Sequence, residues 1–384
     1  MKKILAVTGI RSEYFILQPI FEEMVKRDDL KLKIVVTGTH LSPTYGETYK
    51  IIKNDGYEII KLETLLSTDT FSGRSKSLGI QIMGLTDIVS RENPDMLLVL
   101  GDREESLSTA TVGTYMNIPI IHVCGGDRVV GNIDDSVRHA VTKLAHLHFP
   151  TTKENGDRIL KMGEEPWRVH VVGNPALDSI RKQPDLSYDY INKRLGTKIL
   201  ADKPFILLIK HPLSSEIEKA GEQMRVTLEA VAELGIETIV IYPNSDSGSY
   251  EMIKVIEEYT EKFNFIKAFK TLPRDIFVNL QRKAALLLGN SSAGILEAPF
   301  LKLPVVNVGN RQKQRQHSEN IIFVPHHKEL IKKGINKAIS DGKFKQICKN
   351  CSNPYGDGYS GERIAKIIAE TKITDRLINK QIIY

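Results

Sequence analysis

The amino-acid sequence predicts an α/β protein that contains two Rossmann-like domains in series. Short apolar runs alternate with helix-length amphipathic segments along the chain, a pattern typical of parallel sheets with helices on both faces. The chain has 384 residues, which is more than one hydrophobic core usually organises. The alternation restarts in the second half, so two separate sheets are expected.

The first domain is predicted from runs of branched apolar residues, each suited to one buried strand. In chain order these strands are Lys3–Thr8, Lys33–Thr37, Met96–Leu100, Ile120–Val123 and Val169–Val172. Amphipathic segments between them predict helices such as Phe15–Arg27, Ile80–Arg91 and Ser106–Met116.

The second domain repeats this pattern after a Gly/Pro turn at Gly173-Asn174-Pro175 and a polar connector, so the predicted domains are residues 1–175 and 176–363. Its expected strands are Phe205–Ile209, Thr238–Ile241, Asn264–Phe269, Ala285–Leu288 and Val305–Val308. Its expected helices are Glu216–Leu234, Ser249–Phe263, Asp275–Gln281 and Ile295–Phe300. Two such domains usually face each other across a cleft, with ligands at the carboxyl ends of the strands.

Composition excludes several classes of protein. The 53 Lys and Arg residues exceed the 47 Asp and Glu residues only slightly, and no basic stripe with interleaved aromatic residues predicts nucleic-acid binding. No apolar run is long enough for a membrane span, and the run after Lys2-Lys3 is too short for a signal peptide, so a cytoplasmic protein is expected. Cys124, Cys348 and Cys351 predict neither a disulfide framework nor a zinc site.

The stretch His122–Ala145 joins an apolar strand to a helix through glycines, acids and arginines. An ordinary strand-to-helix loop needs fewer polar groups, so this stretch is expected to handle an anionic, hydroxylated ligand. In the second domain, Gly289-Asn290-Ser291-Ser292 follows a strand and opens a helix, which suits either a phosphate site or a plain Ser N-cap. Glu297, one turn further on, is a candidate to bind ribose hydroxyls.

Other polar residues follow predicted strands, and each has a structural alternative. Arg11 offers a fork for phosphate or is a solvated charge, and its loop lacks the G-x-G-x-x-G pattern of dinucleotide sites. Asp102 is either a catalytic group or a helix N-cap, and His211 is either a ligand-binding or a structural histidine. Arg311 and Arg315 either close over a diphosphate or face solvent.

In their order and spacing these motifs resemble the UDP-N-acetylglucosamine 2-epimerases, specifically the hydrolysing branch that serves sialic acid and related nonulosonic acid synthesis. The resemblance covers nearly the whole chain. It rests on Gly9–Tyr14, Thr37–His40, Tyr45–Gly46, Gly101–Arg103, Ile133–Ala145, Tyr242–Asp246, Gly289–Ser292 with Glu297, Gly309–Gln312 and Asn353–Gly358.

The resemblance implies a GT-B-like fold in which a last helix, near 364–384, packs back on the first domain. It implies that the nucleotide diphosphate is held by Arg11, Arg103, His211, Asn244, Ser291, Ser292, Glu297 and Arg311. Further implied substrate contacts are His40, Cys124, Arg138, Leu272, Gly289 and Asn290. Family members are commonly dimers, so a homodimer is expected.

The implied reaction begins when a base removes the C2 proton of the sugar and the nucleoside diphosphate leaves C1 with anti geometry, giving a 2-acetamidoglycal. Water then adds across the double bond, and a proton reaches the opposite face of C2. The products are the free C2-inverted sugar and UDP, with no cofactor or metal required. Asp102 and Asp134 match the catalytic carboxylates of the family, and His211 is a further catalytic candidate.

Cys124 departs from the family pattern, since many relatives have a catalytic glutamate there. A thiol of ordinary pKa is a poor substitute for a carboxylate. Either Asp127 takes part of that function or Asp134 fulfils it alone. A less polar pocket would suit a UDP- or GDP-linked 2,4-diacetamido-2,4,6-trideoxyglucose better than UDP-N-acetylglucosamine.

Three other functions remain open at the level of sequence. A glycosyltransferase of the same architecture would replace water by an acceptor, and a non-hydrolysing epimerase would return the sugar to UDP. A nucleotide-sugar sensor with an inactive site is the third, because the family glutamate is missing.

Overall fold

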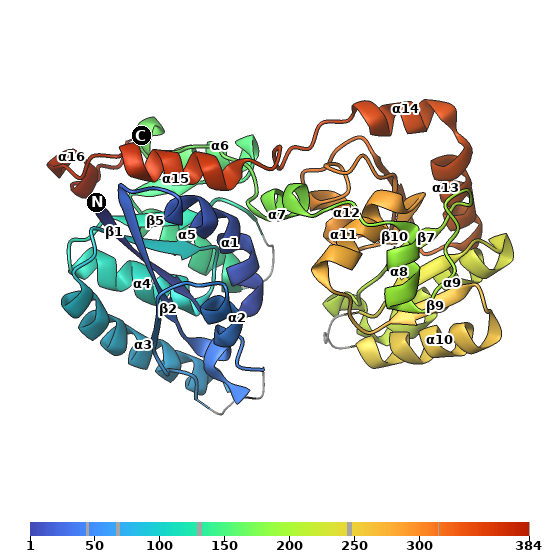
Figure 1. Cartoon of the computed structure of the whole chain (residues 1–384), viewed down its shortest axis with the longest axis horizontal. Helices are drawn as coiled ribbons and strands as arrows, with labels where there is room; N and C mark the ends of the chain where they lie inside the picture. Colours follow the sequence, from blue (N-terminus) through green and yellow to red (C-terminus); the bar gives the residue numbers. More distant parts are fainter. Residues whose placement is uncertain (44–45, 67–69, 129–132, 244–247, 314, 384) are drawn as a thin grey trace. The chain divides into compact units, whose positions relative to one another are not determined.

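The computed structural model describes residues 1–43, 46–66, 70–128, 133–243, 248–313 and 315–383. The chain forms two compact units (Figure 1). The first unit comprises Met1–Arg181 together with Tyr355–Tyr384, and the second unit comprises Lys182–Pro354. The unit boundaries therefore fall at residues 181 and 355. The boundaries expected from the sequence are residues 175 and 363.

The first unit is built on a six-stranded parallel sheet of order β3-β2-β1-β4-β5-β6. Its strands are β1 (Lys2–Thr8), β2 (Leu30–Val36), β3 (Ile59–Lys61), β4 (Met96–Leu100), β5 (Ile120–Val123) and β6 (Leu147–Phe149). Its helices are α1 (Arg11–Val25), α2 (Tyr49–Asn54), α3 (Phe71–Glu92), α4 (Glu104–Tyr115), α5 (Ile133–Leu144), α6 (Lys153–Lys161), α7 (Ala176–Lys182), α15 (Ser360–Glu370) and α16 (Asp375–Ile378).

The second unit repeats the design with a parallel sheet of order β12-β11-β10-β7-β8-β9. Its strands are β7 (Ile206–Ile209), β8 (Thr238–Ile241), β9 (Ile266–Phe269), β10 (Leu286–Gly289), β11 (Val305–Val308) and β12 (Ile321–Val324). Its helices are α8 (Tyr188–Leu195), α9 (Ala220–Leu234), α10 (Ser249–Lys262), α11 (Arg274–Lys283), α12 (Ala293–Leu296), α13 (Lys328–Ser340) and α14 (Gly342–Asn350).

The predicted class of two Rossmann-like domains is confirmed, although three edge strands were not predicted and one predicted strand was wrong. Val169–Val172 forms no strand, because only Val169 makes a bridge, to His148, before the chain turns away at Gly173 with φ +92°. Several helix bounds also differ; for example, α3 begins at Phe71 where the sequence predicts Ile80. The segment Ser214–Lys219 is a separate 3-10 turn, with Glu216 at a non-helical φ of −135°. The last helix expected near 364–384 is two helices, α15 and α16.

The core of the first unit lies on both faces of β1. Ile4 and Ala6 pack on the side of α1, whereas Leu5 and Val7 pack on the side of α3. Side chains alternate between the faces of a strand, so a strand covered on both faces is apolar throughout. All four residues are at most 3% exposed, and burial of each large apolar side chain stabilises the fold by about 1.5–3 kcal/mol.

The C-terminal segment returns to complete the first unit, where α15 packs against α1 (Figure 1). The buried carboxylate of Asp178 accepts hydrogen bonds from the backbone N–H groups of Ser360 (3.0 Å) and Gly361 (2.7 Å), at the start of α15. The fully buried Arg168 donates to the carbonyl oxygens of Leu377 (2.9 Å) and Arg376 (2.6 Å) in α16. Polar groups from the middle of the chain therefore fix both C-terminal helices.

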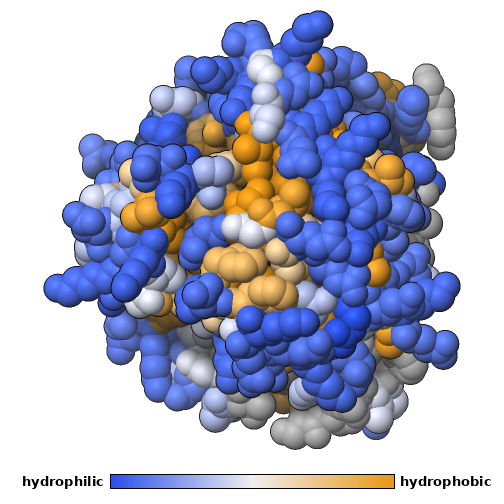
Figure 2. Space-filling model, turned by 90° about the vertical axis from the view of Figure 1, so that its right-hand side faces the viewer, coloured by the Kyte–Doolittle hydropathy of each residue, from blue (hydrophilic) through white to orange (hydrophobic). Residues whose placement is uncertain are grey.

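The surface is mainly hydrophilic on the face that Figure 2 shows, with apolar residues gathered near the centre of that face. Among the described residues, no helix combines the length and the apolar character that crossing a membrane requires.

We predict that Asp178→Ala destabilises the first unit by about 1–3 kcal/mol, because two N–H groups at the start of α15 lose their acceptor. Urea unfolding followed by the fluorescence of Trp167, the only tryptophan, measures this unit directly. Asp87→Ala, at an exposed position of α3, is the matched control and should leave the midpoint unchanged. Equal midpoints for the two variants would contradict the prediction.

Candidate functional site

The candidate residues of the first unit follow β1, β2, β4 and β5 at the carboxyl edge of its sheet. Parallel strands bring these loops together whatever their separation in sequence. Ion pairs connect the loop after β4, the loop after β5 and helix α5. Arg138 of α5 forms ion pairs with the carboxylates of both Asp102 and Asp127, the latter at 3.2 Å. Arg138 is 7% exposed, so its guanidinium fixes the two carboxylates relative to each other.

His122, at the carboxyl end of β5, contacts both the loop that contains Asp102 and the helix that contains Arg138. Its Nε2 lies 2.8 Å from the carbonyl oxygen of Gly101, and its Nδ1 lies 3.2 Å from the hydroxyl of Thr142 in α5. Burial lowers the pKa of His122 to about 3, so the ring is neutral and donates one N–H to Gly101. The histidine thereby connects the residue before Asp102 to the helix that contains Arg138.

Cys124 lies in the same loop as Asp127, and its thiol is protonated at neutral pH. Burial, with a further contribution from the nearby charge of Asp127, raises the pKa of its thiol to about 12. The residue has φ +59° and is half-buried against the core. A protonated thiol leaves Asp127 as the acidic group of this loop, and Asp134 lies half-buried in the first turn of α5.

A second pair of carboxyl groups lies behind the loop after β1, and the sequence analysis did not single it out. Glu13 accepts a hydrogen bond from the N–H of Gly9 (2.9 Å), and Glu105 is so close that a Cβ on Gly9 would be 2.0 Å from its Oε1. Both glutamates are 7% exposed. Burial and the charge of Glu105 raise the pKa of Glu13 to about 8. Arg103, a predicted ligand residue, binds Glu105 at 3.3 Å.

The other predicted residues of the first unit differ in accessibility. Arg11 is exposed at the start of α1, as a phosphate ligand would need to be. His40 is fully buried, and its ring nitrogens lie 3.2 Å from the hydroxyl of Thr8 and 2.8 Å from that of Thr48. Burial lowers its pKa to about 4, so His40 is a neutral group that connects two loops.

In the second unit, the loop after β10 has a backbone that only glycine permits at its first position. Gly289 has φ +127°, and a Cβ there would lie 2.0 Å from the carbonyl oxygen of Ile209. Ser291 is 8% exposed and Ser292 half-buried, immediately before α12. The hydroxyl of Ser291 lies 3.3 Å from the N–H of Ala293. The Ser291 hydroxyl therefore accepts a hydrogen bond within the turn that opens the short helix α12, and the loop stands at the position where phosphate groups bind in other proteins.

Asn290 connects three loops of the second unit. Its side chain accepts from the N–H of His211 (2.7 Å) and donates to the carbonyl oxygen of the same residue (2.9 Å). Its own carbonyl oxygen accepts from Arg311 (3.3 Å) and Gln312 (3.0 Å). The loops after β7, β10 and β11 are therefore held in one arrangement.

A pocket opens beside these loops at the carboxyl ends of β7, β8 and β9. The predicted residues His211, Leu272 and Ser291 line it. Residues that the sequence analysis did not select complete the lining, namely Ile209, Ile241, Tyr242, Lys270, Thr271 and Phe277. Apolar and aromatic walls with a few polar groups are typical of a site for a nucleotide base. Tyr242 belongs to a motif of the resemblance, which was the available signal.

Glu297 and Asn244 complete the predicted set. Glu297 accepts hydrogen bonds from Arg274 (3.2 Å) and Gln281 (2.8 Å), which fix its carboxylate at the end of α12. Asn244 lies outside the described residues. Among the residues described, no group of three or more His, Cys, Asp and Glu side chains is arranged to hold a metal ion.

Comparison with known proteins gives matches over nearly the whole chain. The family model for UDP-N-acetylglucosamine 2-epimerase matches residues 22–369. A hydrolysing UDP-N,N'-diacetylbacillosamine 2-epimerase from Legionella pneumophila is 35% identical over 381 residues, 99% of each chain. A hydrolysing GDP/UDP-N,N'-diacetylbacillosamine 2-epimerase from Campylobacter jejuni is 34% identical, with 84% of each chain covered.

One solved structure illustrates the likeness of the fold. The UDP-GlcNAc 2-epimerase from Neisseria meningitidis, solved with bound UDP-GlcNAc, superposes with a TM-score of 0.78 at 19% identity. The match covers 96% of this chain and 100% of that one. The expected GT-B-like class is confirmed by this likeness.

We predict that Glu13→Gln changes how stability depends on pH. A carboxyl with a pKa of about 8 in the folded state and an ordinary value in the unfolded state binds more protons when folded, so the contribution of Glu13 to stability should decrease as pH rises from 5 to 8.5. A glutamine does not titrate, so over that range the free energy of unfolding of the variant should lack this decrease of a few kcal/mol. Urea unfolding followed by Trp167 fluorescence measures both proteins.

Glu63→Gln, at an exposed position of the same unit, is the matched control and should behave as wild type. Parallel pH profiles for wild type and Glu13→Gln would contradict the raised pKa of Glu13.

Proposed function

Because the chain belongs to the UDP-N-acetylglucosamine 2-epimerase family, we propose that it is a hydrolysing nucleotide-sugar 2-epimerase. Its substrate would be UDP-linked 2,4-diacetamido-2,4,6-trideoxyglucose (N,N'-diacetylbacillosamine), and its products UDP and the free C2-inverted sugar. The names of the two relatives with 35% and 34% identity support this sugar over N-acetylglucosamine. The relative named for both nucleotides makes the GDP-linked sugar the alternative substrate.

The observation that most supports the chemistry is the joint binding of Asp102 and Asp127 by Arg138. Removal of the C2 proton and the later delivery of a proton to the opposite face require acid and base groups in two positions. Two carboxylates held apart by one guanidinium have a fixed spacing, which such a reaction needs. Asp134, in the first turn of α5, is a third proposed carboxylate.

The second unit would bind the nucleotide diphosphate. The loop Gly289–Ser292 offers N–H groups and hydroxyls at a helix start, and Arg311 adds a guanidinium beside it. These donors stabilise the charge that builds on the diphosphate as it leaves C1, so binding also lowers the barrier to elimination. The pocket lined by Tyr242, Leu272 and Phe277 would take the base.

The thiol of Cys124 is consistent with the proposed sugar. With its pKa raised to about 12 by burial, it presents an uncharged, weakly polar surface next to Asp127. A deoxygenated, doubly N-acetylated sugar has fewer hydroxyls to satisfy than N-acetylglucosamine does. Position 124 is therefore a proposed determinant of the substrate.

The proposal predicts that purified protein converts UDP-N,N'-diacetylbacillosamine in deuterated water to free sugar with deuterium at C2. The kcat/KM for this substrate should exceed that for UDP-N-acetylglucosamine about tenfold or more. NMR of the products identifies the sugar, its configuration and the label in one measurement. Free sugar without label would contradict the glycal route, and epimerised sugar still attached to UDP would indicate a non-hydrolysing enzyme.

In the same assay, Asp102→Asn should lower kcat by about 100-fold or more, because a carboxamide cannot take up the C2 proton. Asp157→Asn, at an exposed ion pair of α6, is the control and should retain wild-type turnover. A wild-type protein that binds UDP tightly but turns over neither sugar would instead be a nucleotide-sugar sensor. Product formation only with an added acceptor would indicate a glycosyltransferase.

We also propose that the protein is a cytoplasmic homodimer. Met83 on α3 and Tyr115 at the end of α4 are 73% and 88% exposed, and these two helices pack side by side, so they present apolar surface that a second copy would cover. The free cysteines fit a reducing compartment. Light scattering should give twice the chain mass of 43.2 kDa for wild type and a lower mass for Met83→Glu with Tyr115→Glu. A monomeric wild type would contradict the dimer.

A further inference from the structure

Lys210 is a fully buried lysine directly before His211, at the carboxyl end of β7. Its ammonium group donates to the carbonyl oxygen of Gln223 (2.5 Å), the hydroxyl of Thr227 (2.8 Å) and Nδ1 of His326 (3.2 Å). These contacts use all three N–H groups of a protonated lysine. The side chain therefore has one defined position inside the second unit.

In the part of the chain that the structure describes, no carboxylate forms an ion pair with Lys210. Among the residues described, none of its hydrogen-bond partners is a carboxylate. The carboxylate of Glu216 acts on it from further away and is itself bound by Gln223 at 2.6 Å. Burial lowers the pKa of Lys210 to about 7, and burial and the charge of Lys210 lower that of His326 to about 4. An anion bound nearby would stabilise the protonated lysine.

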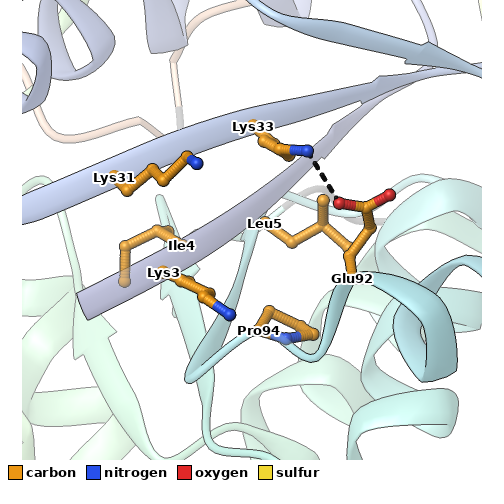
Figure 3. A pocket seen from close by; sticks show the side chains of 7 residues that line it. All are labelled: Lys3, Ile4, Leu5, Lys31, Lys33, Glu92 and Pro94. Atoms are coloured by element: carbon orange, nitrogen blue, oxygen red, sulfur yellow. Dashed lines mark hydrogen bonds and ion pairs between the residues drawn. The ribbon is translucent and has the colours of Figure 1, made fainter. Parts of the chain in front are cut away.

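Lys33 of the first unit, in contrast to Lys210, is paired with carboxylates. Its ammonium group lies in a pocket together with Lys3 and Lys31, and it pairs with Glu92 at 2.8 Å (Figure 3). It also pairs with Glu58 at 2.6 Å. Lys33 thus has two carboxylate partners, whereas the described hydrogen-bond partners of Lys210 include no carboxylate.

His326 connects Lys210 to the loop after β11. A Cβ on Gly309 would lie 2.4 Å from Nε2 of His326, so the imidazole ring packs directly against this glycine, which has φ +88°. Two residues later in the same loop, Arg311 donates to the carbonyl oxygen of Asn290. The lysine, the histidine and the glycine thus form a continuous support beneath the loop that contains Arg311.

Lys210 also lies beside the loop after β10. A Cβ on Gly289 would be 3.3 Å from the backbone nitrogen of Lys210, and the next residue, His211, is held by the side chain of Asn290. The backbone of Lys210 therefore adjoins the loop after β10, whereas its ammonium group reaches the loop after β11 through His326. In a medium of low polarity a charge acts over several ångströms, because little water screens it.

We propose that Lys210 and His326 are positioning residues for the nucleotide diphosphate: the lysine supplies a buried positive charge behind the loop that contains Arg311, and the histidine transmits its position to Gly309 and Arg311. This inference rests on the proposed function, since it assumes a diphosphate ligand. It assigns to the pair the recognition of the anionic part of the ligand and not of the base.

Isothermal titration with UDP, and ligand-observed NMR titration with uridine, test this inference. Lys210→Met should weaken UDP binding about tenfold or more, because its side chain fills similar space without a charge. Uridine has no phosphate, so its affinity should change less than twofold. In turnover, KM should rise more than kcat falls. His326→Gln should weaken UDP binding by a smaller factor, since the lysine remains.

Lys33→Met removes a paired lysine from a different unit and is the matched control, with wild-type affinity for UDP expected. Should circular dichroism show that Lys210→Met does not fold, Lys210→Gln replaces it with the same expectation, because the amide keeps an N–H donor. Unchanged UDP affinity, or equal losses for UDP and uridine, overturns the inference. A wild type that releases free sugar and binds UDP, beside an unaffected Lys210→Met, overturns this inference alone. A wild type that binds no nucleotide diphosphate overturns the proposed function with it.

Discussion

Parallel pairing of every strand is the constraint on which both units depend. Each crossover must leave the carboxyl edge of its sheet, so loops that are far apart in sequence end side by side. In the first unit this edge joins Asp102 to Arg138, and Glu13 to Glu105. In the second unit it places the backbone and side chain of Asn290 between two other loops. Charged groups at both edges then become fixed because the backbones that bear them are fixed.

The central strands could be predicted from sequence because burial on both faces leaves an unbroken apolar run, as in Met96–Leu100. Edge strands have no such signature. Ile59–Lys61 is three residues long and ends in an exposed lysine, and the strand Ile321–Val324 is only half-buried. At Val169–Val172 the opposite error arose, since only Val169 forms a bridge, to His148, and Val171 is 50% exposed. Short apolar segments do not reveal whether a neighbouring strand is available.

Individual site residues could be recognised from sequence, but their partnerships could not. Asp102, Asp127 and Arg138 were each selected, yet the guanidinium bridge between the two acids depends on the tertiary packing of α5. Glu13 and Glu105 were overlooked because they become neighbours only when β1 and β4 pair. His40 shows a different case: the family resemblance implies that it contacts the substrate, and in the structure both ring nitrogens are hydrogen-bonded within the protein. Sequence indicates which groups are present, and the fold decides which of them remain available.

The return of Tyr355–Tyr384 to the first unit has a consequence for the order of folding on the ribosome. The sheet of this unit is synthesised first, yet the side chains of α1 that face α15 have no cover until the second unit has been translated. Arg168 and Asp178 meanwhile lack the C-terminal partners that satisfy them. The nascent first unit therefore exposes an apolar strip on α1 until the final helices have been translated, and such transiently exposed surface favours aggregation.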